Sequence, residues 1–216
     1  TGTIVTSAEV EQFMAAVPDH VLVVLDEAYY EFVDSDAVTN AVVTNAVVTN
    51  AVVTNAEYPD SVRYVREGRK NVLVLRTFSK IYGMAGLRLG YGIACPEVTA
   101  CLAQARESFP VNRLAQAAGL AALDDQEFLR RTVEMNHAGR LYLYRELDRL
   151  GLRCVRSHTN FVLVRVGPQA GQVFQELLRR GIIVRPGTGY DLPEYLRITV
   201  GAPEQNARLI EALKSA

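Results

Sequence analysis

The sequence predicts an α/β fold, in which a mainly parallel sheet domain is followed by a small α+β domain. Short apolar runs at 21–25 and 72–75 alternate with helical patterns, which is typical of strands covered on both faces of a parallel sheet. Further along, a long amphipathic helix is followed by short strands and two more helices. We therefore predict two domains, residues 1–125 and residues 126–216.

The remaining elements of the first domain are predicted from caps, periodicity and glycines. A helix is expected after Thr6 or Ser7, because both are good N-cap residues and apolar residues follow at helical spacing. The segment SVRYVREGRK predicts a helix that ends at Gly68. The segment GLRLGYGIA predicts a third strand, with glycines where backbone or ligand approaches closely.

The rest of the chain is predicted to contain long helices and then a small mixed unit. Helical patterns cover residues 96–108, 112–123, 125–151, 170–181 and 203–216, and strands are expected within 151–166, 182–187 and 194–201.

Residues 37–55 break this pattern, because they repeat AVVTN with a period of five. That period matches neither the strand repeat of two nor the helix repeat of 3.6. Three perfect copies are also too few for a repeat solenoid. We interpret the segment as an extended, weakly ordered loop between a strand and a helix.

Charge and composition exclude several classes of protein. The 216 residues carry 23 basic and 24 acidic side chains, so the sequence predicts no nucleic-acid partner. The apolar run Val21–Leu25 is too short to span a membrane. Three cysteines without a C-x-x-C pair suit reduced thiols in a cytoplasmic protein, and the three histidines show no metal-ligand spacing.

Polar side chains gather where the first two predicted strands end. Asp26 and Tyr29 follow the first strand, Thr77, Ser79 and Lys80 follow the second, and Arg88 comes eight residues after the lysine. Taken alone, each also fits a plain structural role, such as a solvated lysine at a strand end or a polar start to a loop. Because ligands bind at the carboxyl ends of parallel strands, we expect these groups to converge if the two strands are neighbours.

The residue types in this set suit one cofactor. A lysine amine can attack a carbonyl carbon, and hydroxyls with a guanidinium can hold a phosphate. An aspartate can keep a pyridine nitrogen protonated, which makes the ring an electron sink. Together these roles describe a site for pyridoxal 5'-phosphate.

Two segments resemble the signatures of a known family. DEAYYEF and TFSKIYGMAGLRLGYG are similar to motifs of the fold-type I aminotransferases that depend on pyridoxal phosphate, and most closely to those of histidinol-phosphate aminotransferase. The opening TGTIV resembles the end of that family's Asn-Pro-Thr-Gly turn, and LRITVG resembles its carboxylate-binding strand. The resemblance covers nearly the whole chain except the repeat. It implies that residues 1–125 are the remaining part of the family's cofactor-binding sheet domain.

The resemblance also implies a role for each residue of the set. Lys80 would hold the cofactor covalently and move a proton at the substrate Cα. Asp26 would pair with the pyridine nitrogen, and Tyr29 would hydrogen-bond the phenolic oxygen of the ring. Thr77, Ser79 and Arg88 would hold the cofactor phosphate. Arg197 would bind the substrate carboxylate, and Arg185 would face the substrate's own phosphate.

The activity implied is transamination between L-histidinol phosphate and 2-oxoglutarate, a step of histidine biosynthesis, in a homodimeric enzyme. Two alternatives stay open at this point. One is another aminotransferase, or a decarboxylase of a phosphorylated amino acid, from the same group. The other is a catalytically inactive fragment, because the family chain carries a long stretch before its Thr-Gly turn. That stretch holds a ring-stacking aromatic residue and a glycine turn for the phosphate.

Overall fold

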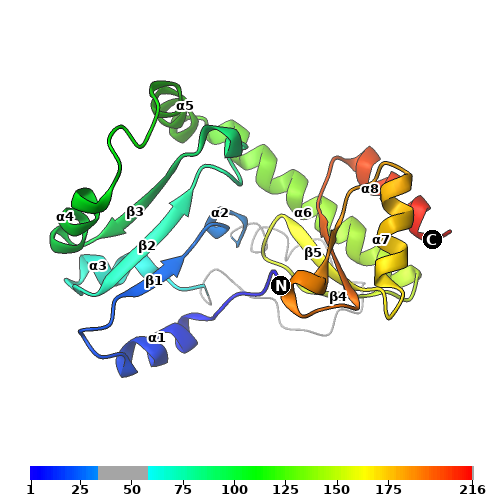
Figure 1. Cartoon of the computed structure of the whole chain (residues 1–216), viewed down its shortest axis with the longest axis horizontal. Coiled ribbons are helices and arrows are strands. Elements are labelled where there is room, and N and C mark those ends of the chain that lie inside the picture. The colour runs from blue at the N-terminus through cyan, green and yellow to red at the C-terminus, as the bar shows by residue number, and fades with distance from the viewer. Residues whose placement is uncertain (34–57, 216) are drawn as a thin grey trace. The chain divides into compact units, whose positions relative to one another are not determined.

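The structure is a computed structural model of the whole chain, and it describes residues 1–33 and 58–215 (Figure 1). They form two compact units, which are described separately. The N-terminal unit comprises Val5–Arg131, and the C-terminal unit comprises Thr132–Ala216 with Thr1–Ile4. The predicted loop at 37–55 lies outside the described residues. The assignment of a cofactor domain and a small domain to residues 1–125 and 126–216 stays a prediction.

A three-stranded sheet is the centre of the N-terminal unit. Its strands are β1 (Val23–Asp26), β2 (Val72–Thr77) and β3 (Gly90–Ala94), and β2 lies between the other two (Figure 1). β1 runs parallel to β2, with Asp26 opposite Leu75. β3 runs antiparallel to β2, with Gly90 opposite Thr77. The first two strands are thus the expected parallel neighbours, so their carboxyl ends meet at one edge of the sheet.

Among the described residues, five α-helices lie wholly within this unit: α1 (Ser7–Ala16), α2 (Tyr30–Val33), α3 (Ser61–Arg66), α4 (Pro96–Ala105) and α5 (Arg113–Asp124). The helix predicted after Thr6 or Ser7 is capped by Thr6, whose hydroxyl accepts from the Glu9 N–H at 3.3 Å. The Glu9 carboxylate accepts in return from the Thr6 N–H at 2.8 Å. This reciprocal pair satisfies two donors at the helix start.

The core of the N-terminal unit is small among the described residues. Val10 and Met14 of α1 pack with Val72 and Val74 of β2. The outer strand β1 contributes Val23 to this core, whereas its Val24 is 49% exposed. One side of the sheet is therefore covered by α1 and α3, and β1 has no strand on its outer edge among the described residues.

The C-terminal unit contains a four-stranded antiparallel sheet in the order β4-β5-β7-β6. Its elements are the part of α6 (Gln126–Arg149) from Thr132 on, β4 (Arg153–Val155), β5 (Phe161–Arg165), α7 (Ala170–Arg179), β6 (Arg185–Pro186), β7 (Tyr195–Thr199) and α8 (Pro203–Leu213). Leu143, Leu147, Leu177 and Leu196 are fully buried in its core. These side chains come from two helices and the sheet, so the hydrophobic cluster joins both layers.

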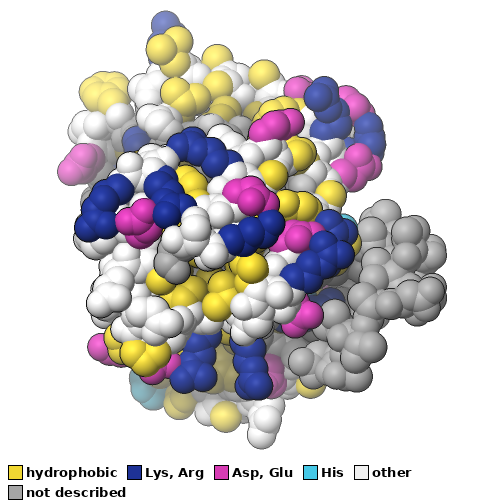
Figure 2. All heavy atoms as spheres, turned by 90° about the vertical axis from the view of Figure 1, so that its right-hand side faces the viewer, with side chains coloured by type: hydrophobic (Ala, Val, Ile, Leu, Met, Phe, Trp, Pro, Cys, Tyr) yellow, Lys and Arg dark blue, Asp and Glu magenta, His cyan; other side chains and the backbone are white. Residues whose placement is uncertain are grey.

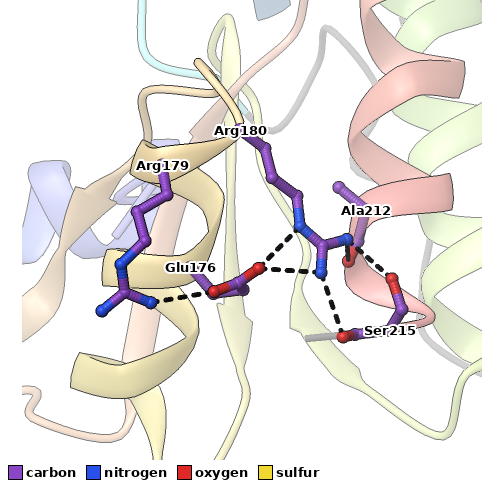
Figure 3. Close-up of polar contacts among 5 residues, drawn as sticks. All are labelled: Glu176, Arg179, Arg180, Ala212 and Ser215. Carbon is purple, nitrogen blue, oxygen red and sulfur yellow. Dashed lines mark hydrogen bonds and ion pairs between the residues drawn. The ribbon is translucent and has the colours of Figure 1, made fainter.

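A guanidinium links the ends of α7 and α8 (Figure 3). Arg180 donates to the Glu176 carboxylate at 2.9 Å, to the Ser215 hydroxyl at 2.6 Å and to the Ala212 carbonyl at 3.2 Å. Hydrogen bonds first from Arg180 and then from Arg179 lower the pKa of Glu176. The pair of helices is therefore held by polar contacts at this end as well as by the core.

The surface shown in Figure 2 carries interspersed basic and acidic side chains, as the near-zero net charge predicts. Among the described residues, no helix combines the length and hydrophobicity needed to cross a bilayer. Within the same residues, no three histidine, cysteine or acidic side chains are grouped closely enough to hold a metal ion.

Candidate active site

A pocket of about 670 Å³ lies at the carboxyl ends of β1 and β2. Its lining comes from two chain segments, residues 26–28 and 75–92. It therefore combines the end of β1, the end of β2, the turn after β2 and the start of β3. Of the predicted set, the lining includes Asp26, Thr77, Ser79, Lys80 and Arg88. The structure brings these five residues together although up to 62 positions separate them in the chain.

Lys80 stands in the turn that follows β2 and is half-buried. Its Nζ lies 5.2 Å from the centre of the Tyr29 ring, which favours the cation. Tyr29 does not itself line the pocket, so the structure places it beside the lysine rather than on the pocket wall. The turn is closed by a hydrogen bond from the Gly83 N–H to the Lys80 carbonyl at 3.0 Å. Gly83 has a φ of +68°, a conformation that glycine adopts without strain.

Thr77 and Ser79 begin the same turn. The Ser79 N–H donates to the Thr77 hydroxyl oxygen at 3.0 Å, and that hydroxyl donates to the Leu89 carbonyl at 3.4 Å. Thr77 therefore fixes the local backbone and ties it to the segment that leads into β3. Ser79 also lines the pocket, and its hydroxyl takes no part in these two contacts.

Asp26 is the last residue of β1 and is exposed. Its Oδ1 accepts from the Ala28 N–H at 3.0 Å, which holds the carboxylate at the strand end. This is its one hydrogen bond among the described residues, so further acceptor positions stay available toward the pocket.

Arg88 follows the short 3₁₀-helix η3 (Ala85–Leu87) and has a left-handed backbone, with a φ of +56°. Such a conformation is costly for a residue with a long side chain, and residues of this kind cluster at ligand sites. Its Nη1 donates to the Ala85 carbonyl at 2.7 Å. The strained backbone and this contact direct an exposed guanidinium to the pocket lining.

A buried ion pair that includes Arg76 of the pocket lining was not predicted from the sequence. Arg76 donates from Nε and Nη2 to Glu27 Oε2 at 3.0 and 2.9 Å, and its guanidinium lies 3.8 Å from the centre of the Tyr30 ring. Burial disfavours the charged form of Arg76, but the hydrogen bond and charge of Glu27, followed by those of Tyr91, favour it, and the pKa of Arg76 is raised. Burial, followed by the Glu27 charge, raises the pKa of Tyr58 nearby.

Arg185 and Arg197 lie in the C-terminal unit, directly opposite each other on β6 and β7. The Arg185 guanidinium lies 5.1 Å from the Tyr190 ring centre, and the Arg197 guanidinium lies 4.7 Å from the Phe161 ring centre. Neither arginine forms an ion pair with a carboxylate of the described residues. Like charges at directly opposed positions destabilise a sheet, so this pairing marks a place where an anion would be favoured.

Comparison with known proteins gives the context for this pocket. The sequence profile described as "Aminotransferase class I and II" matches residues 1–213. The chain is 49% identical over 213 residues to the histidinol-phosphate aminotransferase of Akkermansia muciniphila, covering 99% of this chain and 52% of that protein. It is 48% identical over 216 residues to the enzyme of the same name from Symbiobacterium thermophilum, covering 54% of it. The chain thus spans about half the length of these curated relatives.

The fold is also found in solved structures. The histidinol-phosphate aminotransferase of Sinorhizobium meliloti, solved in complex with pyridoxal-5'-phosphate, superimposes with a TM-score of 0.81 at 28% identity. The match covers 100% of this chain and 55% of that one. A family profile that matches almost every residue, together with this fold, is decisive for ancestry: the chain belongs to the aminotransferase class I and II family.

Proposed function

We propose that this chain is the part of a pyridoxal phosphate-dependent aminotransferase that carries its catalytic lysine, and that the enzyme acts on L-histidinol phosphate. The observation that carries the proposal is the convergence of Lys80, Asp26 and Arg88 on one pocket at the strand ends. The similarity to relatives named histidinol-phosphate aminotransferase supports the choice of substrate. No observation favours the decarboxylase alternative.

The residues present fit the cofactor. An amine, a carboxylate, two hydroxyls and a guanidinium line the same pocket, which matches the aldehyde, ring nitrogen and phosphate of pyridoxal phosphate. Ser79, Thr77 and Arg88 would hold the phosphate, and Asp26 would keep the ring nitrogen protonated. Lys80 would hold the cofactor covalently, and Tyr29 would donate to the phenolic oxygen. When bound, the cofactor supplies an electron sink for the bond that breaks at the substrate Cα.

Lys80 would have a second task, which is to move the proton at the substrate Cα. A proton-transfer group must lie within hydrogen-bond reach of the atom it serves, and the lysine lies in the pocket lining at the turn after β2. The Tyr29 ring beside Nζ restricts where the amine swings. Asp26 anchors the opposite part of the ring, so the pair would fix the cofactor between them.

Arg185 and Arg197 would bind the anionic groups of the substrates. Histidinol phosphate carries a phosphate, and 2-oxoglutarate carries carboxylates, so both half-reactions bring an anion to the enzyme. The two opposed guanidiniums lack carboxylate partners among the described residues, and a bound anion would relieve their repulsion. We assign Arg185 to the phosphate and Arg197 to the carboxylate. We also propose a cytoplasmic homodimer for the complete enzyme.

The test compares Arg185→Ala with the control Arg179→Ala, which removes an exposed arginine of α7. Because a charge-assisted hydrogen bond is worth about 1.5–3 kcal/mol, Arg185→Ala should lower kcat/KM for histidinol phosphate roughly ten- to a hundredfold. It should leave an unphosphorylated amino acid nearly unaffected, and the control should change neither value. Equal losses for both substrates would mean that Arg185 has a structural role.

The assay uses the chain alone and the chain mixed with a separately expressed segment covering the rest of the Akkermansia muciniphila relative. Transamination of histidinol phosphate by the chain alone, or by the chain together with that segment, supports the proposal. Absence of turnover in both, with saturating pyridoxal phosphate, contradicts it.

A further inference from the structure

The Glu27–Arg76 ion pair is deeply buried, with side chains only 3% and 16% exposed. Burying two charges is costly, and a hydrophobic pair of similar volume is often at least as stable. Glu27 Oε1 is also buried without a hydrogen-bond partner among the described residues. The pair is therefore poorly explained as a device for stability, and its place in the fold suggests another role.

That place is one residue beyond the last paired row of β1 and β2. Asp26 is opposite Leu75, and the Glu27 N–H donates to the Leu75 carbonyl at 2.9 Å. The ion pair joins the next residue on each strand. β1 is held on one side only among the described residues, so its carboxyl end depends on β2 for its position. Asp26 immediately precedes Glu27, and Thr77 immediately follows Arg76.

The contacts of Arg76 make this connection rigid. Two nitrogens of its guanidinium converge on one oxygen of Glu27, and the planar group stacks on the Tyr30 ring of α2. Tyr30 lies in the short helix that follows β1, so Arg76 contacts that segment at two residues, Glu27 and Tyr30. A lysine could not reproduce this, because it has neither the planar face nor the forked donors.

We propose that Glu27 and Arg76 are positioning residues that hold Asp26 at a fixed distance from the turn carrying Ser79 and Lys80. Arg76 lines the pocket, but its guanidinium is engaged by Glu27 and by the Tyr30 ring, so the pair acts through the strand ends and not by touching the cofactor ring. Its effect on cofactor binding rests on the proposed function, whereas its effect on the geometry of the strand ends does not.

The first experiment measures hydrogen exchange in the chain without cofactor. Glu27→Gln and Arg76→Met should speed exchange about tenfold or more in peptides covering 26–30 and 76–82, and leave those covering 93–105 unchanged. The matched control is Lys70→Met, which removes the exposed 3.1 Å pair with Glu97 near the other end of β2. Unchanged exchange at the strand ends, or an equal rise throughout Val5–Arg131, would overturn the proposal. If Arg76→Met unfolds the unit, Arg76→Lys takes its place, and the exchange rates of the same peptides decide whether the proposal holds.

The second experiment separates positioning from general stability by a double-mutant cycle. Glu27→Gln should raise the Kd for pyridoxal phosphate, followed by absorbance, about tenfold in the parent chain and less than about twofold in an Asp26→Ala background. Equal factors in both backgrounds would show that the pair does not act through Asp26. If neither the parent chain nor its mixture with the separately expressed segment binds pyridoxal phosphate, the proposed function fails, and the exchange experiment still decides the role of the pair.

Discussion

The two units differ in how completely they bury their apolar surfaces. In the C-terminal unit, Leu147 and Leu177 from the helices and Leu196 from the sheet are fully buried in one cluster. In the N-terminal unit, Val24 of β1 is 49% exposed and Leu120 of α5 is 69% exposed. The candidate cofactor pocket lies in this more open unit. The pocket residues therefore belong to a sheet whose outer strand, β1, is paired on one side only, with β2, among the described residues.

This difference concerns function as well as stability. Local opening needs less free energy where few apolar contacts hold an element, and ligand sites are often found in such regions. An exposed apolar strand edge is also prone to association with other chains. We expect the C-terminal unit to behave as the rigid part of the chain and the N-terminal unit as the part whose order depends on added partners or ligand.

Thiol labelling should give the largest difference between the units. Burial raises the pKa of Cys154 in the C-terminal unit to about 12, with a smaller contribution from Asp148, whereas Cys101 in the N-terminal unit is exposed. Because the thiolate is the reactive form, Cys101 should be alkylated at pH 8 at least about a hundredfold faster than Cys154.

Mass spectrometry of the labelled peptides measures the two rates. In denaturant both cysteines should react at similar rates, which is the control. Equal rates in the native protein would mean that the C-terminal unit opens as readily as the N-terminal one.

Truncation of apolar side chains should give the next largest effect. Leu177→Ala removes a fully buried side chain and should lower the free energy of unfolding by about 2–5 kcal/mol. Val24→Ala removes a half-exposed one and should cost less than about 1 kcal/mol. Urea titration followed by hydrogen exchange in each unit measures both. A cost for Val24→Ala as large as that for Leu177→Ala would show that the outer face of β1 is covered in solution.

The smallest expected effect concerns acid. Hydrogen bonds from Arg180 and Arg179 lower the pKa of Glu176, so its stabilising contribution is present above the unfolded value of about 4.5 and is lost as the pH falls below it. Glu176→Gln should therefore reduce the pH dependence of Tm between pH 3 and 5, because the small loss of Tm that it causes is present at pH 7 and absent at pH 3. A Tm profile with the same slope in both proteins would show that the contact in Figure 3 does not form in solution.

Local sequence signals were enough to predict most elements and the five-residue set at the pocket. The N-cap at Thr6 and the apolar runs of β1 and β2 are local features, and the two strands then bring Asp26 and Lys80 to one edge. Other features depend on register between distant segments. The antiparallel direction of β3 and the pairing of Glu27 with Arg76, 49 positions apart, were not predicted for that reason.

One signal for the ion pair is present in the sequence, although Glu27 taken alone also fits a polar start to a loop. Glu27 follows one predicted strand and Arg76 ends the next, so opposite charges occupy equivalent positions on parallel neighbours. A search for opposite charges one residue beyond each strand would have found it. That Arg185 and Arg197 lie directly opposite each other could not be predicted either, because it depends on the register of β6 and β7. The sequence indicated each residue only separately.

The central claim is that Lys80 holds the cofactor, and covalent trapping tests it most directly. The chain contains three lysines, Lys70, Lys80 and Lys214, and of these only Lys80 lines the pocket. Incubation with pyridoxal phosphate, reduction with borohydride and peptide mapping should place the label on Lys80. Lys80→Arg should remove that label and leave the two exposed lysines at background. A label distributed equally over the three lysines, or concentrated on Lys70 or Lys214, would contradict the account.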